Sequence, residues 1–474
     1  MSSEVLPGEK EAGAPPGPRG FTQIMRLIAQ RRRDPLGLYL QLVNQYGDLV
    51  YFRVGRIGYA LVSDPDCIQH VLQTNASNYV KGPGYERLRG ILGNGLITSE
   101  GEQWRFQRRL TVPEFHQGRI AASVQDVVRV TREMMAGWET PATSSTPVDL
   151  ADEMSRVTLK IVSQSLLGSD PSARAEEVRV SVQNALNFSD GGGIVLHRLI
   201  DILIPARYRS RAFRMKERAP LPGSKRFMQS VGVVDDVVGR IVADRRRSND
   251  YGNDLLGAFM KAQDQDNGSR MNDTQLRDAI TTILIAGHET TATALTWTWH
   301  LLDENRAVAA KMREEIDRVI GDRDPGFEDV AQLRYTHHAF EEALRYYPPV
   351  WRLSRVAIGD DAMMGFRIPA GTVVIISPYV THRSRRFWAN PETFNPDRFE
   401  TATERPRFVY IPFGAGQRYC VGANFVFMEA IIVLALVARR WSFTPIKQPF
   451  EYAAGPTLRP AHGLPVLVSR RELA

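Results

Sequence analysis

Cysteine is scarce in this sequence, which has only Cys67 and Cys420 among 474 residues. Two cysteines cannot build a disulfide framework, and neither lies in a CxxC pair of the kind that binds zinc. A reducing compartment, the cytoplasm, therefore fits the composition best.

The sequence also lacks a long apolar run. Residues 1–20 are rich in Pro, Gly and charge and include Pro15-Pro16-Gly17-Pro18, so we expect a flexible lead-in and no signal sequence or membrane anchor. The longest helical pattern, 273–304, has an apolar centre at residues 283–286, but His288 and Glu289 interrupt it. This pattern predicts a buried central helix and not a membrane span.

Neither sign of charge dominates, since 60 basic and 53 acidic side chains give a formal net charge of +7. Such a balance fits a solvated surface or one basic face that meets an acidic partner. No nucleic-acid-binding motif is present. The GxGxxG, GxxxxGK[ST], GxSxG and HExxH patterns are absent from any useful context, which argues against the enzyme classes that they mark.

The remaining pattern is that of one helix-rich domain over residues 21–474 with a small β portion. Helices are expected near 65–74, 102–114, 119–138, 149–167, 225–247, 273–304, 305–320, 330–346 and 421–440. A hairpin broken at Gly55 is expected over 49–62, and strands over 351–357 and 366–377. The glycines of 80–98 predict a loop, and 190–224 reads as a solvated connection or as a mobile lid over a pocket.

The most informative segment is FGAGQRYCVG, residues 413–422. Its glycines allow a backbone to fold closely around a sulfur and a flat ligand. A helix pattern begins at Cys420, whose amide dipoles would favour a thiolate; Arg418 adds positive charge nearby, and Phe413 could limit water. A thiolate on haem iron donates electron density that assists O–O cleavage.

This segment resembles the haem-binding loop of the cytochrome P450 family, FxxGxRxCxG, matched at Phe413, Gly416, Arg418, Cys420 and Gly422. The resemblance implies haem b (iron protoporphyrin IX) with Cys420 as the axial iron ligand. It also implies the family's triangular, mainly α fold, a single domain with haem between the long 273–304 helix and the cysteine-bearing helix.

A second motif, AGHETT, lies in the long helix at residues 286–291. The Thr290 hydroxyl can bond to the carbonyl of Ala286, four residues back, and Gly287 weakens the helix at that turn. The motif resembles the family's acid–alcohol pair. By that resemblance Ala286 lies at the haem, Glu289 relays protons from solvent, and Thr290 holds dioxygen and its water. On the residues alone, a polar patch packed against a neighbouring helix is an equal alternative.

Two further motifs match the family. Glu342 and Arg345 resemble its ExxR pair, and Arg398 the arginine that joins it; this resemblance implies a buried charge network that fixes the cysteine loop. Trp104 and Arg108 lie four apart on one helix face and resemble WxxxR, whose members bind a haem propionate. The resemblance adds Arg418 to the residues that bind the propionate, and it adds Arg352 on the basis of its spacing after Pro348-Pro349.

The implied reaction inserts one oxygen atom of O₂ into an organic substrate. Electrons would come from a separate ferredoxin or flavodoxin-type partner with its NAD(P)H reductase, and Arg105 and Arg109 are candidates for its docking face; we expect a monomer. A haem-thiolate isomerase or dehydratase that does not use O₂, a non-enzymatic haem sensor, and a scaffold without haem are the alternatives.

The expected substrate pocket is apolar, so we predict a lipophilic substrate. Fatty acids and terpenoids are favoured, and polyketides stay open. Besides the 80–98 loop, its wall should include Phe188, Ile285, Val350, Trp351 and Leu458.

Overall fold

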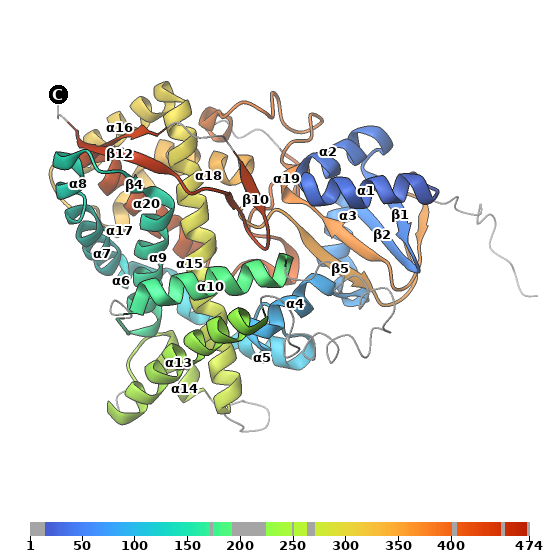
Figure 1. Cartoon of the computed structure of the whole chain (residues 1–474), viewed down its shortest axis with the longest axis horizontal. Helices are drawn as coiled ribbons and strands as arrows, with labels where there is room; N and C mark the ends of the chain where they lie inside the picture. The colour runs from blue at the N-terminus through green and yellow to red at the C-terminus, as the bar shows by residue number, and fades with distance from the viewer. Residues whose placement is uncertain are drawn as a thin grey trace, which may run out of the picture.

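The computed structural model describes residues 15–170, 174–191, 224–248, 251–262, 271–400, 405–446 and 451–471. Within these residues the chain is mainly helical, as predicted, with a larger helical part and a smaller sheet-containing part side by side (Figure 1). Of the expected lid, 190–224, the structure describes residues 190, 191 and 224, and the rest lies outside the described residues.

The long central helix is α15 (Asp273–Glu304), and it begins with a capping box in which Asn272 and Gln275 bond each other's backbone N–H groups. It packs against α9 (Leu150–Leu167), α13 (Ser224–Ser248), α18 (Arg334–Tyr346) and α20 (Ala423–Arg440). A Cβ on Gly287 would lie 2.9 Å from Cγ2 of Val162. Glycine there lets α9 cross α15 closely.

The remaining helical elements surround this group. They are α1 (Phe21–Arg33), α2 (Pro35–Tyr46), α3 (Pro65–Gln69), α4 (Pro83–Leu92), α5 (Gly101–Thr111), α6 (Gln117–Ala122), α7 (Val124–Ala136), α8 (Glu139–Ser144), α10 (Ala175–Gly191), α14 (Leu255–Lys261), α16 (Arg306–Ile320), α17 (Phe327–Gln332) and α19 (Pro378–Thr381). Short turns of helix are η1 (His70–Thr74), η2 (Ala76–Asn78), η3 (Val112–Phe115), η5 (Pro396–Phe399) and η6 (Gly416–Arg418).

The main sheet has five strands in the order β1-β2-β8-β5-β3. Its strands are β1 (Leu49–Val54), β2 (Ile57–Val62), β8 (Val373–Ile376), β5 (Leu353–Ala357) and β3 (Tyr79–Lys81). The predicted hairpin forms β1 and β2, and Gly55 makes its turn with φ 60°. The antiparallel register of β3 and β5 places Lys81 directly opposite Arg355.

Three smaller sheets complete the β portion. One joins β4 (Val148–Asp149), β12 (Pro465–Arg470) and β9 (Trp441–Pro445), and the others pair β6 (Asp361–Met363) with β7 (Phe366–Ile368) and β10 (Tyr452–Ala454) with β11 (Leu458–Pro460). In the part of the chain described, no helix is long and apolar enough to cross a membrane.

Three predicted boundaries are corrected. The expected loop 80–98 contains α4, because Pro83 suits a first helical position and Gly93, at φ 56°, suits the residue after the last. The flexible lead-in does not extend over 15–20, where the amide of Tyr51 in β1 donates to the carbonyl of Pro16 at 2.8 Å; residues 1–14 are not described. The cysteine-bearing helix begins at Ala423 and not at Cys420.

Candidate functional site

The cysteine loop leads directly into α20. The amide of Cys420 donates to the carbonyl of Phe413 at 3.1 Å, and the N–H groups of Gly422 and Ala423 donate to the Cys420 sulfur. Gly416 has φ 67°, and a Cβ there would lie 1.9 Å from the carbonyl oxygen of Leu72 in η1. Only glycine allows this contact, which braces the loop from outside.

Burial raises the pKa of the Cys420 thiol, while the two amides and the Arg108 guanidinium act in the opposite direction. The expectation that Arg418 supplies the nearby positive charge is therefore corrected. The Arg418 guanidinium pairs with Glu100 and donates to the carbonyl of Ser99 at 3.0 Å, so the charge beside the sulfur belongs to Arg108.

Trp104 connects the two arginines. The Arg418 guanidinium lies 3.8 Å from the centre of the Trp104 ring and that of Arg108 lies 5.7 Å from it. Arg108 also donates to the carbonyl of Tyr419 at 3.0 Å. The predicted set of Trp104, Arg108 and Arg418 is thus brought together beside Cys420.

Positive charge accumulates next to this set. Lys81 and Arg355 face each other across β3 and β5, and both lie near Arg418, with Glu100 as the nearby carboxylate. Burial, together with the Arg418 and Arg355 guanidiniums, lowers the pKa of Lys81 well below its usual value. Burial likewise lowers the pKa of Arg418 to about 10.

Like charges that face each other across strands are destabilising, and buried charges are costly unless they are paired. Three basic side chains around one carboxylate leave an excess of two positive charges when Lys81 is protonated. The two carboxylates of a haem b group would balance this excess, so the donor set fits a flat ligand with two acidic side chains placed beside the Cys420 sulfur.

Sequence reasoning missed Lys81 and Arg355. The Arg355 side chain is buried in β5, whereas Arg352, which was chosen by spacing, is only half-buried and lies over the ring of its neighbour Trp351 at 4.7 Å. The alternation of β5 in residues 353–357 was the available signal, because it places Leu353, Arg355 and Ala357 on one face.

The middle turn of α15 differs from its flanks. Ala286, Gly287, Glu289 and Thr290 keep accessible surface, although residues 279–285 and 291–299 are buried. The Thr290 hydroxyl donates to the carbonyl of Ala286 at 2.7 Å, as the sequence predicts. This turn is therefore less tightly enclosed than the turns on either side of it.

Glu289 accepts a hydrogen bond from the Thr457 hydroxyl at 3.0 Å. Burial raises the pKa of the Glu289 carboxyl, while Thr457, Arg459 and Arg179 act in the opposite direction. The carboxyl consequently keeps its proton to higher pH than an exposed glutamate does.

His288 points the other way, toward α9. Its Nε2 lies 2.7 Å from the hydroxyl of Ser155, and burial lowers its pKa to about 4. A neutral histidine packed between two helices has a structural role and does not carry protons.

Glu342 and Arg345, both fully buried in α18, form the core of a charge network. The Arg345 Nε lies 2.7 Å from Glu342 Oε2 and the Arg398 Nε lies 2.9 Å from Oε1. The amide of Asn395 donates to the same Oε1 at 2.9 Å. The arrangement of three residues implied by the sequence is therefore present.

His382 extends this network and was not predicted. Its carbonyl accepts from Arg345 at 2.8 Å, and its Nε2 accepts from the amide of Ile411 at 2.9 Å. Burial and the Arg345 guanidinium lower its pKa well below the usual value, so the ring is neutral. Because Ile411 lies just before the cysteine loop, His382 joins the network to that loop.

The expected pocket residues divide into two groups. Phe188 is half-buried and stacks on Phe227 with ring centres 4.7 Å apart, and Ile285 lies in α15 one residue before the accessible turn. Val350 is half-buried. Trp351 and Leu458, in contrast, belong to the apolar core beside α2. With 1% and 0% of their surfaces exposed, they cannot line an open pocket, and their assignment to its wall is corrected.

Comparison with known proteins agrees with this arrangement. The family model described as "Cytochrome P450" matches residues 15–452. Cyclooctatin synthase of Streptomyces melanosporofaciens is 36% identical over 422 residues, which are 87% of this chain and 86% of the relative. Cyclooctat-9-en-7-ol 5-monooxygenase of the same organism is 31% identical, covering 87% and 86%. Pentalenene oxygenase of Streptomyces avermitilis is 29% identical, covering 88% of each chain.

The chain therefore belongs to the cytochrome P450 family. It is a monooxygenase with haem b as its cofactor, and it uses O₂, an organic substrate and electrons from a redox partner.

The charge network yields a prediction about stability. Glu342→Gln leaves two buried guanidiniums without their shared carboxylate, and we expect the free energy of unfolding to fall by about 3–5 kcal/mol. Chemical denaturation measures this loss. Glu102→Gln, which removes an exposed ion pair with Arg105, should change it by less than about 1 kcal/mol; equal losses in the two variants would contradict the role given to Glu342.

Proposed function

We propose that the Cys420 sulfur would bind the haem iron and that Lys81, Arg355 and Arg418, with Trp104 and Arg108, would hold the haem carboxylates. The observation that carries this proposal is the gathering of three basic side chains around the single carboxylate of Glu100, next to the cysteine loop. Phe413, Gly416 and Gly422 shape the loop: Phe413 packs near Phe427, with ring centres 5.4 Å apart, and shields the sulfur from water. Haem, when bound, supplies the activation of O₂ and the transfer of one oxygen atom.

In this proposal Glu289 and Thr290 transfer protons at the accessible turn of α15, beside Ala286. Burial raises the pKa of the Glu289 carboxyl and so favours its protonated form, and the Thr457 hydroxyl fixes the orientation of that carboxyl group. The Thr290 hydroxyl donates its hydrogen to the carbonyl of Ala286, so the hydroxyl oxygen can accept a hydrogen bond from water. Together they pass protons inward one at a time.

Electrons, we propose, arrive from an acidic ferredoxin or flavodoxin-type protein at the surface beside the cysteine loop. Arg105 and Arg109 lie on α5, whose Arg108 contacts the loop at Tyr419. Tyr419 itself is 45% exposed. A basic helix next to an exposed aromatic side chain suits a transient interface with a partner of opposite charge.

The proposed substrate is a lipophilic terpenoid hydrocarbon or its alcohol. Ile285, which precedes the accessible turn, and the half-buried side chains of Phe188 and Val350 are apolar, which suits an apolar molecule. Two relatives also carry names that denote an unsaturated hydrocarbon and an unsaturated alcohol, pentalenene and cyclooctat-9-en-7-ol. These names favour terpenoids over fatty acids and polyketides.

The ligand assignment is tested by the absorption spectrum of the dithionite-reduced protein with carbon monoxide. We expect a strongly red-shifted Soret band that Cys420→Ala abolishes. Cys67→Ala should keep the band, because Cys67 is a buried thiol in α3 whose pKa burial raises to about 12. An unshifted band in the unsubstituted protein, or its persistence in Cys420→Ala, would disprove the assignment.

The carboxylate-binding cations are tested by the rate of haem loss. Arg355→Gln removes a charge-assisted hydrogen bond worth about 1.5–3 kcal/mol, so transfer of haem to an acceptor apoprotein should be roughly ten- to a hundredfold faster. Arg352→Gln, three residues away, should change the rate by less than about twofold, a small difference in free energy. The reverse order would restore Arg352 as the residue that binds the carboxylate.

Substrate class is tested by titrating the protein while following the Soret band. Cyclic terpenoid hydrocarbons and their alcohols should shift the band at lower concentrations than fatty acids of equal carbon number, because their compact apolar surface fills such a pocket better. Tighter binding of the fatty acids would reject the terpenoid proposal, and a response to polar compounds alone would reject a lipophilic substrate.

A further inference from the structure

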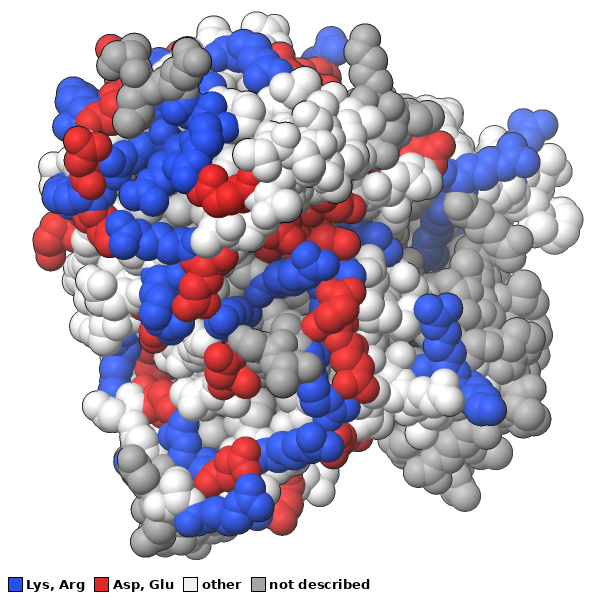
Figure 2. All heavy atoms as spheres, turned by 60° about the vertical axis from the view of Figure 1, so that its left-hand side comes forward, with Lys and Arg blue, Asp and Glu red and all other residues white. Residues whose placement is uncertain are grey.

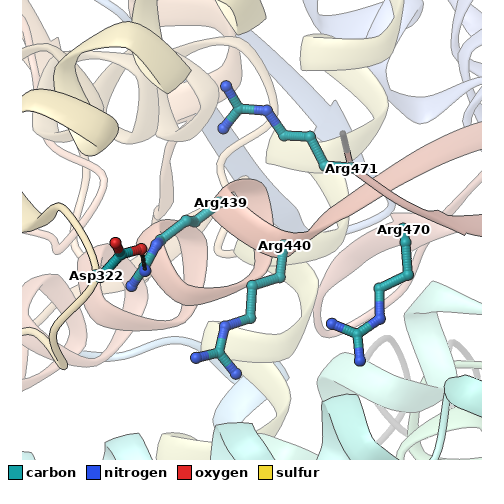
Figure 3. A pocket seen from close by; sticks show the side chains of 5 residues that line it. All are labelled: Asp322, Arg439, Arg440, Arg470 and Arg471. Carbon is teal, nitrogen blue, oxygen red and sulfur yellow. Dashed lines mark hydrogen bonds and ion pairs between the residues drawn. The ribbon is translucent and has the colours of Figure 1, made fainter. Parts of the chain in front are cut away.

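A surface hollow lined mainly by arginines lies away from the site described above. It has a volume of about 390 Å³ and is lined by Asp322, Arg439, Arg440, Arg470 and Arg471 (Figure 3). Arg439 and Arg440 are the last two residues of α20, and Arg470 ends β12. Because α20 has 18 residues, its length of about 27 Å separates the hollow from the cysteine loop.

Two further arginines lie near lining residues, Arg132 near Arg440 and Arg313 near Arg471, although they do not line the hollow themselves. Four of the six arginines pair with carboxylates. The pairs are Arg132 with Asp324, Arg439 with Asp322, Arg470 with Glu139 and Arg471 with Asp317. Among the described residues, these six arginines and the four carboxylates that pair with them leave an excess of two positive charges. Basic side chains gather on this side of the molecule, which carries α8, α16 and β12 (Figures 1 and 2).

The excess resides on Arg440 and Arg313. No described residue forms a hydrogen bond or an ion pair with either side chain, although both residues are half-buried. Burial and the neighbouring guanidiniums of Arg132, Arg439 and Arg470 lower the pKa of Arg440. In Figure 3 the side chains of Arg440 and Arg470 extend in the same direction from two different elements, so both guanidiniums can approach one ligand.

Arg439 gives the hollow a rigid wall. Only 7% of its side chain is exposed, and its guanidinium is fixed by Asp322 at 2.6 Å and by the carbonyl of Arg323 at 3.0 Å. The partial negative charge at the C-terminus of α20 accounts for two arginines in its last turn. It does not account for the arginines that converge there from α7, α16 and β12.

We propose that this hollow is a binding site for a phosphate-bearing molecule. A phosphate monoester carries nearly two negative charges at neutral pH, which matches the excess. Its oxygens suit the planar fork of arginine, which binds phosphate through paired hydrogen bonds. A single carboxylate would neutralise only half of the excess.

The concave shape favours a small molecule over a protein surface. A volume of about 390 Å³ falls within the range of roughly 300–1,000 Å³ that is usual for small-molecule sites. The same chemistry is offered by a soluble phosphate compound and by the headgroup of an anionic phospholipid. The experiment below separates these two sources.

The experiment measures binding of inorganic diphosphate to the haem-loaded protein by calorimetry, and binding of vesicles that contain phosphatidate by sedimentation. Arg440→Gln should weaken the binding of at least one probe about tenfold, because a charge-assisted hydrogen bond is worth about 1.5–3 kcal/mol. Arg318→Gln, an equal charge change at an exposed position on α16, should leave the affinity unchanged. The carbon monoxide spectrum should be the same in both variants and shows that each is folded.

Diphosphate binding that depends on Arg440 identifies a soluble ligand, and vesicle binding with the same dependence identifies a lipid headgroup; either result supports the site. Equal affinities in Arg440→Gln and in the unsubstituted protein would overturn the proposal. So would a surface that binds neither probe but retains an acidic protein, which would show the patch to be a protein-docking face.

Discussion

The carboxylate of Glu342 is the constraint on which the position of the cysteine loop depends. It accepts from Arg345, from Arg398 and from the amide of Asn395, and so ties α18 to the chain that follows residue 389. A hydrophobic core of equal volume could be as stable. It would not fix the orientation of α18 relative to residues 395–398, as these hydrogen bonds do.

His382 connects the Glu342 network to the cysteine loop. It links the guanidinium of Arg345 to the amide of Ile411, nine residues before Cys420. From the other side Gly416 abuts η1, where no side chain would fit. The loop is therefore held before its start and at Gly416 by neighbours that are distant in sequence, and the amides of Gly422 and Ala423 donate to the sulfur.

The sequence predicted best what depends on helix geometry. Glu342 with Arg345, Trp104 with Arg108 and Thr290 with Ala286 are three or four residues apart, so the helix period alone brings each pair together. Lys81 and Arg355 could not be found in this way. They meet only because β3 pairs with β5, two strands separated by more than 270 residues, and spacing after Pro348-Pro349 led instead to Arg352.

The errors at 80–98 and at the pocket wall have related causes. Glycines were counted as loop formers, but Gly93 ends a helix that Pro83 begins, and position within the element decides the effect of a glycine. Trp351 and Leu458 are apolar and close in sequence to the expected pocket. Their side chains nevertheless turn into the core beside α2, a choice that depends on the packing of residues 36–42 and not on their own identity.

The two ends of α20 have charged neighbours of opposite kinds. Amides at its N-terminus meet the Cys420 sulfur and arginines lie at its C-terminus, which is the arrangement that the helix dipole favours at each end. At a separation of about 27 Å the Coulomb interaction between the arginine hollow and the Cys420 sulfur is small. Residues 428–439 of α20 are all buried, so packing holds the helix along most of its length. The chemistry at Cys420 is therefore set locally by the loop, by Arg108 and by the Glu342 network.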